Sequence, residues 1–270
     1  MKWPAASPRL AWRGIHAASE LQDRVDHRRL GRSGGRIRPP VGRRRDRLEE
    51  LARDLRARHG VAVDVLPADL ATEEGLAAVE TAIAGSDSLD LLVNDAGFGG
   101  KTGFVKGEVA DHLRMVRVHV EAVIRLTKAA LPGLIARGRG AVVNVSSIAG
   151  FSPFTGAMYS GTKSFLVMFS INLQAEVRSK GVVLQALCPG MTHTEFHQVA
   201  EIDKSIVPAP LWMTAGRVVG ISLRRLGHGV VCVPGWTNAI IAFFMRCPAT
   251  GVLVRTVGRL FMLRRNKGVD

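Results

Sequence analysis

Cysteine is scarce in this 270-residue chain, which contains only Cys188, Cys232 and Cys247. An odd number without paired spacing gives no sign of a disulfide framework and is typical of a protein kept in a reducing cytoplasm. Cysteine and histidine also show none of the spacings typical of metal ligands, so we expect no metal site. The composition therefore favours a cytoplasmic protein.

Long apolar runs are also missing from the sequence. No run approaches the roughly 20 residues that a membrane-spanning helix needs, and the first residues show no apolar segment of the secretory kind. The net charge is +14, distributed as +9 in residues 1–47, −3 in residues 48–213 and +8 in residues 214–270. No aromatic interleaving or nucleic-acid motif accompanies this charge, so we expect no nucleic-acid partner.

A group of polar residues follows a short β-branched run at residues 141–145, which is typical of a buried parallel strand. Ser146 and Ser147 stand at the end of this strand, and Tyr159 and Lys163 stand at the start of the next helical stretch. Residues four apart share one face of a helix, so the phenol and the ammonium can meet.

This arrangement has a chemical use. A free tyrosine has a pKa of roughly 10, and we expect the adjacent ammonium of Lys163 to lower the pKa of Tyr159. A serine hydroxyl could bind a carbonyl while the phenol exchanges a proton with an alcohol or ketone. The Tyr-x-x-x-Lys spacing by itself is also typical of an exposed helix pair, but the preceding strand and its serines favour the chemical interpretation.

Strands and helices alternate along the chain, which predicts a parallel sheet covered on both faces. The hydrophobic periodicity predicts helices at 46–59, 73–83, 108–134, 157–179 and 210–226, and strands at 61–66, 89–93, 141–146, 181–187 and 229–233. We expect the long third helix to stop near Pro132. The polar motifs fall at the carboxyl ends of strands, where ligands bind in such sheets.

The order Ser147, Tyr159, Lys163 resembles the catalytic core of the short-chain dehydrogenase/reductase family. Residues 94–97, Asn-Asp-Ala-Gly, resemble the family's Asn-Asn-Ala-Gly, and residues 189–194 resemble its Pro-Gly-x-x-x-Thr. The resemblance runs from about residue 41 to 235. It implies a Rossmann-like doubly wound α/β fold and an NADP-dependent oxidoreductase that transfers a hydride between nicotinamide and a carbonyl or alcohol. We divide the chain into an atypical segment (1–40), this domain (41–235) and a C-terminal extension (236–270).

The resemblance also assigns residues to the cofactor and to catalysis. Ser147 would polarise the substrate carbonyl, Tyr159 would be the general acid or base, and Lys163 would also hold the cofactor ribose. The other residues that the resemblance places at the cofactor are Arg43, Arg44, Asp69, Asn94, Ala96, Gly97, Pro189, Gly190, Thr192 and Thr194. Arg43, supported by Arg44, favours the 2′-phosphate of NADP over NAD. Asp69 is equally typical of a helix N-cap. Arg43 and Arg44 are also typical of a solvated charge cluster at the start of a helix.

Two positions depart from the family pattern. His119 stands where the family has an asparagine in a proton relay; it could replace that residue, since histidine titrates near neutral pH, or it could be a buried structural histidine. The loop before Tyr159 is one residue shorter than usual, which leaves Ser146 as an alternative to Ser147, although we favour Ser147.

The family's phosphate-binding glycine loop is missing from the sequence. The nearest imitation, residues 31–37, is followed at once by Pro39 and Pro40 and leaves no room for a crossover helix. We therefore expect the first strand and glycine loop to be missing or disordered, either because the N-terminus is divergent or because it is read out of frame. The alternative function is a catalytically impaired remnant of the family.

The two remaining segments concern partners. Residues 195–213 would form a substrate lid, and they do not identify the carbonyl or alcohol. Residues 236–270 alternate apolar runs with basic residues, which is typical of a helix lying on a membrane surface. The same pattern would suit a helix pair that caps the substrate pocket or packs in a homo-oligomer. We thus expect a mainly cytoplasmic protein, with peripheral membrane contact left open.

Overall fold

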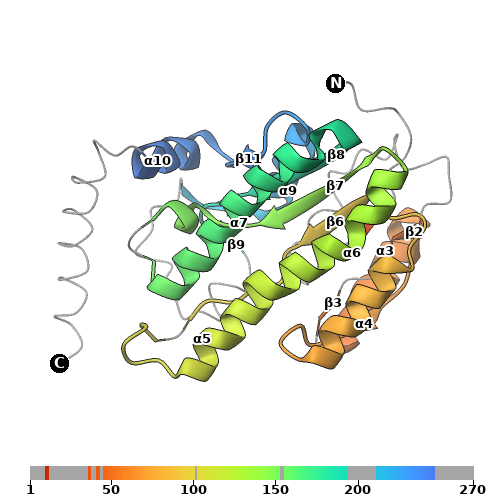
Figure 1. Ribbon diagram of the computed structural model, residues 1–270, viewed down its shortest axis with the longest axis horizontal. Coiled ribbons are helices and arrows are strands. Elements are labelled where there is room, and N and C mark those ends of the chain that lie inside the picture. The colour runs from red at the N-terminus through yellow and green to blue at the C-terminus, as the bar shows by residue number, and fades with distance from the viewer. Residues whose placement is uncertain are drawn as a thin grey trace.

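The fold is a parallel sheet with helices on both faces (Figure 1). This computed structural model describes residues 10–11, 36–37, 41–42, 45–100, 102–152, 155–193 and 211–246. The main sheet is all parallel and has the spatial order β1 (Leu10–Ala11), β6 (Leu91–Asn94), β7 (Gly140–Val145), β8 (Val182–Leu187), β11 (Val231–Cys232). The expected Rossmann-like α/β class is confirmed.

Helices fill the connections between these strands. In chain order they are α3 (Arg45–His59), α4 (Glu73–Ala84), α5 (Val109–Val116), η1 (Arg117–Glu121), α6 (Ala122–Ala136), η2 (Ile148–Phe151), α7 (Ala157–Val177), η3 (Arg178–Lys180), α9 (Ala215–Arg225) and α10 (Trp236–Arg246). In Figure 1, α6 and α7 cross in front of the central strands, and α4 lies alongside α6.

The sheet is buried on both faces because its strands are apolar on both. Leu92, Val142 and Leu184 pack with residues of α4 and α6 in the largest hydrophobic cluster. Their neighbours along the strands face the other way, where Val143 packs with Val218 of α9. Alternate side chains of a strand point to opposite faces, so near-continuous apolar runs are what a doubly covered sheet requires.

Short strands before residue 45 pair with the rest of the domain. Leu10–Ala11 forms β1 beside β6. The first strand is therefore present, and our expectation that it is missing or disordered was wrong. The strands β2 (Arg36–Ile37) and β3 (Val41–Gly42) pair in parallel with β4 (Ala62–Val63) and β5 (Leu66–Pro67), into which the expected strand 61–66 is divided. The glycine-loop region, residues 12–35, lies outside the described residues, and the division into domains stays a prediction.

The long helix differs from expectation at Pro132, which lies inside α6 and does not end it. Proline costs one helical hydrogen bond, but Leu131 and Ile135 pack against the largest hydrophobic cluster on either side of it. This burial holds the helix together until Ala136. Upstream, η1 is a single π-helical turn, a feature frequent at functional sites.

The segment expected to be helical from residue 210 begins its helix later. Met213–Thr214 forms the short strand β10, which pairs with β9 (Thr192–His193). The Thr214 hydroxyl then accepts a hydrogen bond from the Arg217 amide and caps α9. Backbone pairing with β9 thus competes with the helix over the first residues of this segment.

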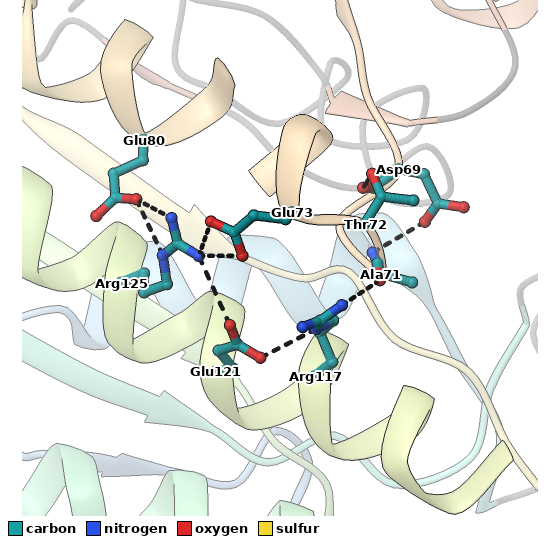
Figure 2. Close-up of polar contacts among 8 residues, drawn as sticks. All are labelled: Asp69, Ala71, Thr72, Glu73, Glu80, Arg117, Glu121 and Arg125. Carbon is teal, nitrogen blue, oxygen red and sulfur yellow. Dashed lines mark hydrogen bonds and ion pairs between the residues drawn. The ribbon is translucent and has the colours of Figure 1, made fainter. Parts of the chain in front are cut away.

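Helices α4 and α6 are joined by an ion-pair network, which Figure 2 shows. Arg125 of α6 binds Glu73 at 2.7 Å and Glu80 at 2.6 Å, both on α4, and lies 3.6 Å from Glu121. Arg117 binds the second oxygen of Glu121 at 3.1 Å. Single exposed ion pairs contribute little, but a network with bidentate geometry contributes more.

We predict that Arg125→Met lowers the melting temperature by roughly a few degrees, because two helices lose their polar connection. High salt should reduce the difference, since it screens the network. The matched control is Arg58→Met, which removes an exposed pair with Asp54 within α3 and should change little. Melting curves that are identical for both variants and the wild type would contradict the role of the network.

Candidate active site

The end of β7 supplies two serines whose side chains have different surroundings. Ser146 is 4% exposed, and its hydroxyl donates to the backbone carbonyl of Lys163 at 2.7 Å. Ser147 is half-buried; its hydroxyl accepts from the Ala149 amide at 3.1 Å and also hydrogen-bonds the phenol of Tyr159. Of the two alternatives, Ser147 is the serine beside the phenol.

The first turns of α7 bring Tyr159 and Lys163 together, as their spacing predicts. The Lys163 ammonium lies 5.7 Å from the centre of the Tyr159 ring. The same ammonium donates to the carbonyl of Val145 at 2.8 Å, and Lys163 is 5% exposed. The lysine therefore connects the catalytic helix to the end of β7.

The pKa of Tyr159 moves in the direction opposite to our expectation. Burial raises the pKa of Tyr159 to about 12, Asp95 adds to the rise, and the Ser147 hydrogen bond partly opposes it. Burial lowers the pKa of Lys163 to about 8, with Asp95 opposing the change. The Lys163 ammonium hydrogen-bonds the Val145 carbonyl and not the phenol. Desolvation of the phenolate therefore determines the direction in which the pKa of Tyr159 shifts.

Sequence reasoning missed Asp95 as part of this site. Burial raises the pKa of its carboxyl group to about 6, and the nearby Lys163 partly counteracts the rise. The available signal was its position, since Asp95 stands where the family motif has a second asparagine. The carboxyl group and the two groups whose pKa values it affects, Tyr159 and Lys163, form one electrostatic unit.

His119 is held on both ring nitrogens. The backbone amide of Phe98 donates to Nε2 at 3.0 Å, which places the proton of the neutral ring on Nδ1. Nδ1 then donates to the Thr162 hydroxyl at 3.0 Å, and Thr162 donates to the carbonyl of Tyr159 at 3.0 Å. The ring thus clamps the loop after β6 to the catalytic helix, a partner role for Thr162 that sequence reasoning also missed.

The surroundings of His119 bear on the two roles that the sequence left open for it. Burial lowers the pKa of His119 well below 6.5, and the positive charge of Lys163 lowers it further. A histidine with this pKa stays neutral across the physiological range. The geometry favours the structural alternative over the proton relay.

Asn94 ties strands together rather than facing outward. It is 5% exposed, and its amide donates to Asn144 on β7 at 2.9 Å and to Thr127 on α6 at 3.2 Å. Asn144 in turn donates to Ser170 of α7 at 2.9 Å. This chain of buried amides fixes the sheet edge and the helices around the site.

The small residues after Asn94 let the loop lie close to its neighbours. A Cβ atom on Gly97 would lie 3.0 Å from Nε2 of His119 and 3.5 Å from Nζ of Lys163, so glycine allows the loop its close approach. Ala96 lines a small cavity with Leu70, Val118 and Asn94. The resemblance places the cofactor along this loop, and that assignment of Ala96 and Gly97 stays a prediction.

Asp69 is not the N-cap of α4, although it lies just before that helix. Its carboxylate accepts from the Ala71 amide at 3.0 Å and lies 3.8 Å from Arg114, while the hydroxyl of Thr72 caps the helix by accepting from Gly75. Figure 2 shows Asp69 beside Ala71, whose carbonyl accepts from Arg117. The N-cap alternative is therefore corrected in favour of Thr72.

The loop after β8 is fixed from two sides. The Ile148 amide donates to the Pro189 carbonyl at 2.9 Å, and the Thr192 hydroxyl donates to the Gly190 carbonyl at 3.1 Å. A Cβ atom on Gly190 would lie 2.2 Å from Oδ1 of Asn238, a buried residue of α10 that sequence reasoning missed. The C-terminal helix therefore packs directly on the loop that the resemblance places at the nicotinamide.

Some predicted site residues lie outside the described residues, namely Arg43, Arg44, Thr194 and most of the lid at 195–213. Within the described ranges, no group of three or more His, Cys, Asp or Glu is arranged to hold a metal ion. In the same part of the chain, no helix combines the length and apolarity needed to cross a membrane.

Comparison with known proteins agrees with this architecture. The family model described as short chain dehydrogenase matches residues 27–205. The chain is 39% identical to serine 3-dehydrogenase of Rhizobium radiobacter over 73% of this chain and 79% of that protein. It is 40% identical to serine 3-dehydrogenase of Agrobacterium fabrum over 58% of this chain, a match that spans 62% of that relative's length.

A solved structure shows the same likeness in three dimensions. The short-chain dehydrogenase from Sphingobium yanoikuyae, in complex with NADPH, is 31% identical and superimposes with a TM-score of 0.76 over 85% of this chain and 88% of that one. The parallel fold with polar groups at its strand ends defines a dinucleotide-binding type of α/β protein. The chain belongs to the short-chain dehydrogenase/reductase family.

We predict that Tyr159 keeps its proton until unusually high pH. Tyr159 is the only tyrosine of the chain, so tyrosinate absorbance reports on this residue alone, and its midpoint should lie near 12. Unfolded tyrosine ionises near 10, so stability from this group is complete below about pH 10 and is lost as the pH rises toward 12. Tyr159→Phe should abolish the signal, and a wild-type midpoint at or below 10 would contradict the prediction.

We also predict that Gly190→Ala destabilises the protein by about 1–3 kcal/mol through overpacking against Asn238. Because the clash is with one side chain, Asn238→Ser should relieve part of it, and the double variant should lose less stability than the two single variants together. Gly161→Ala is the matched control, since a Cβ there meets no atom within 4 Å. Strict additivity in denaturant unfolding would rule out the contact.

Proposed function

We propose that this protein is an NADP-dependent oxidoreductase that transfers a hydride between nicotinamide and a carbonyl or alcohol substrate, with Tyr159 as the proton-exchanging group. The observation that carries the proposal is the meeting of Ser147, Tyr159 and Lys163 at the carboxyl end of β7. The cofactor, when bound, supplies or accepts the hydride. The residues of this chain manage the substrate oxygen and its proton.

The serine and the tyrosine have separate tasks in carbonyl reduction. The Ser147 hydroxyl donates a hydrogen bond to the substrate oxygen and polarises the carbonyl group. The Tyr159 phenol gives its proton to that oxygen as the carbonyl carbon is reduced, and the phenolate is reprotonated afterwards. The phenol is protonated in the free protein at neutral pH, since burial raises the pKa of Tyr159 to about 12, so it can act as the proton donor in reduction.

Lys163 and Asp95 set the charge balance around the phenol. The ammonium lies 5.7 Å from the centre of the Tyr159 ring, and its positive charge would stabilise a phenolate that forms in the reaction. The carboxylate of Asp95 opposes the phenolate. The phenolate of Tyr159 would exist only during the reaction. A buried cation such as the Lys163 ammonium attracts it strongly, because charges interact more strongly in surroundings of low polarity than in water. The lysine would also bind the cofactor ribose, as the resemblance implies.

NADP fits the sequence on the adenosine side. Arg43 and Arg44 supply positive charge for the 2′-phosphate, and Gly97 and Gly190 keep two loops free of side chains next to Lys163 and Asn238. The related Sphingobium enzyme was solved with NADPH. Asp69, Ala96, Pro189, Thr192 and Thr194 remain the further contacts that we propose.

The substrate class is a small carbonyl or alcohol compound. Two relatives are named serine 3-dehydrogenase, so a 3-hydroxy acid is the first substrate to test, followed by simple ketones.

A homo-oligomer is the assembly that we propose, and the cytoplasm is the proposed location. The alternative is an impaired remnant, which the absent glycine loop favours.

The test is Tyr159→Phe, which removes the proton donor but keeps the ring. Turnover with NADPH and a ketone should fall about 10²–10⁴-fold, while NADPH binding, followed by tryptophan fluorescence, should persist. The matched control is Ser160→Ala, whose hydroxyl pairs with Thr155 rather than with the site, and it should keep wild-type turnover.

Two results would count against the proposal, and they are distinguishable. Unchanged turnover in Tyr159→Phe would show that the tyrosine is not the proton donor. Failure of the wild-type protein both to bind NADPH and to turn over any substrate would favour the impaired remnant.

A further inference from the structure

Helix α10 has an unusual distribution of side chains. Four of its large apolar residues are exposed: Trp236 is 74% exposed, Ile240 47%, Phe243 66% and Phe244 46%. Its two buried residues are small or polar, since Ala242 is 2% exposed and Asn238 is 1% exposed, while Ile241 and Met245 are half-buried. A surface helix of a globular protein normally shows the reverse arrangement.

The helix is nevertheless fixed to the domain in this orientation. The amide of Asn238 donates to the carbonyl of Pro234 at 3.1 Å, and a Cβ on Gly190 would collide with the same side chain. At the other end, the guanidinium of Arg246 lies 3.7 Å from the centre of the Phe151 ring in η2. Contacts at both ends thus set which face of α10 is exposed.

The sequence that includes and follows this helix is strongly basic. Residues 236–270 contain five arginines and one lysine, and Asp270 is their only acidic residue. Exposed tryptophan and phenylalanine on one helix, with a basic sequence directly after it, match the chemistry of an anionic bilayer, which offers an apolar interior below a negative surface. Among the described residues no helix is suited to cross a membrane, so the contact would be with the surface.

A second copy of the chain fits this face less well. Every copy of the chain carries the same basic sequence from residue 236 to 270, and like charges repel. Anionic lipid attracts the same charges. The charge therefore decides between the two occupants of the apolar face.

We propose that α10 attaches the protein to anionic membrane surfaces, with Trp236, Ile240, Phe243 and Phe244 entering the lipid. The attachment is reversible and weakens with salt, because it joins a modest apolar area to charge attraction. The inner face of the same helix contacts Gly190 through Asn238, so the enzyme site lies directly behind the membrane-facing helix. The proposal does not depend on which substrate the enzyme takes.

The test uses the full-length protein and vesicles of phosphatidylcholine with or without phosphatidylglycerol. The wild type should co-sediment with the anionic vesicles at low salt, and with neutral vesicles or at high salt it should stay largely in solution. The double variant Phe243→Ser/Phe244→Ser should bind at least about tenfold more weakly, since two aromatic side chains no longer enter the lipid. Trp236 fluorescence should shift to the blue on binding, and Trp236→Phe should lose that shift.

The matched control is Leu113→Ser, which removes another exposed apolar side chain (62% exposed) on α5, a helix that lies apart from α10 in Figure 1. It should leave vesicle binding unchanged. Equal weakening by this variant, or no binding of the wild type to anionic vesicles at low salt, would overturn the proposal. Sedimentation velocity should show the same oligomeric state for the wild type and the double variant; dissociation of the variant would assign the face to a second copy instead.

Discussion

The structure depends on how closely the start of α7 docks on the end of β7. Ser146 holds the backbone carbonyl of Lys163, and the ammonium of Lys163 holds the carbonyl of Val145. A Cβ on Gly150 would lie 2.9 Å from the Lys163 backbone, so the loop between strand and helix lies almost on the lysine. These contacts place Ser147 against Tyr159, and a shift of the helix would separate all of them.

This docking buries ionisable groups and changes their chemistry. Burial moves the pKa of Lys163 to about 8, that of Tyr159 to about 12 and that of Asp95 to about 6, each toward the uncharged form. Removing charge from water is unfavourable, and the apolar packing of the sheet has to offset that cost. A reaction that creates charge at the phenol could then use the ammonium of Lys163, because a charge buried in the protein is screened less than one in water.

Two buried polar side chains hold loops of the site in place. His119 hydrogen-bonds both the loop after β6 and α7, and Asn238 of α10 packs against Gly190 in the loop after β8. Each is a single polar side chain among close-packed atoms, so neither neighbour can move independently. The active site, the sheet edge and the C-terminal helix therefore behave as one packed unit.

The sequence by itself determined the fold class, the order of most elements and the three residues that we propose as the catalytic centre. Short-range periodicity encodes strands and helices, and the spacing of Tyr159 and Lys163 fixes their common helix face. The π-helical turn at His119, the continuation of α6 through Pro132 and the capping of α4 by Thr72 were not readable, because they depend on what packs against each segment.

Only the tertiary structure decided the state of the groups at the centre. The sequence predicts a lowered pKa for Tyr159 from one neighbour, whereas the fold surrounds the phenol with desolvating atoms and Asp95. The sequence favours Ser147 but leaves Ser146 as an alternative, and only docking on α7 gives each serine its partner. The physical reason is that pKa values and hydrogen-bond partners depend on distance and burial, which arise from residues far apart in the chain.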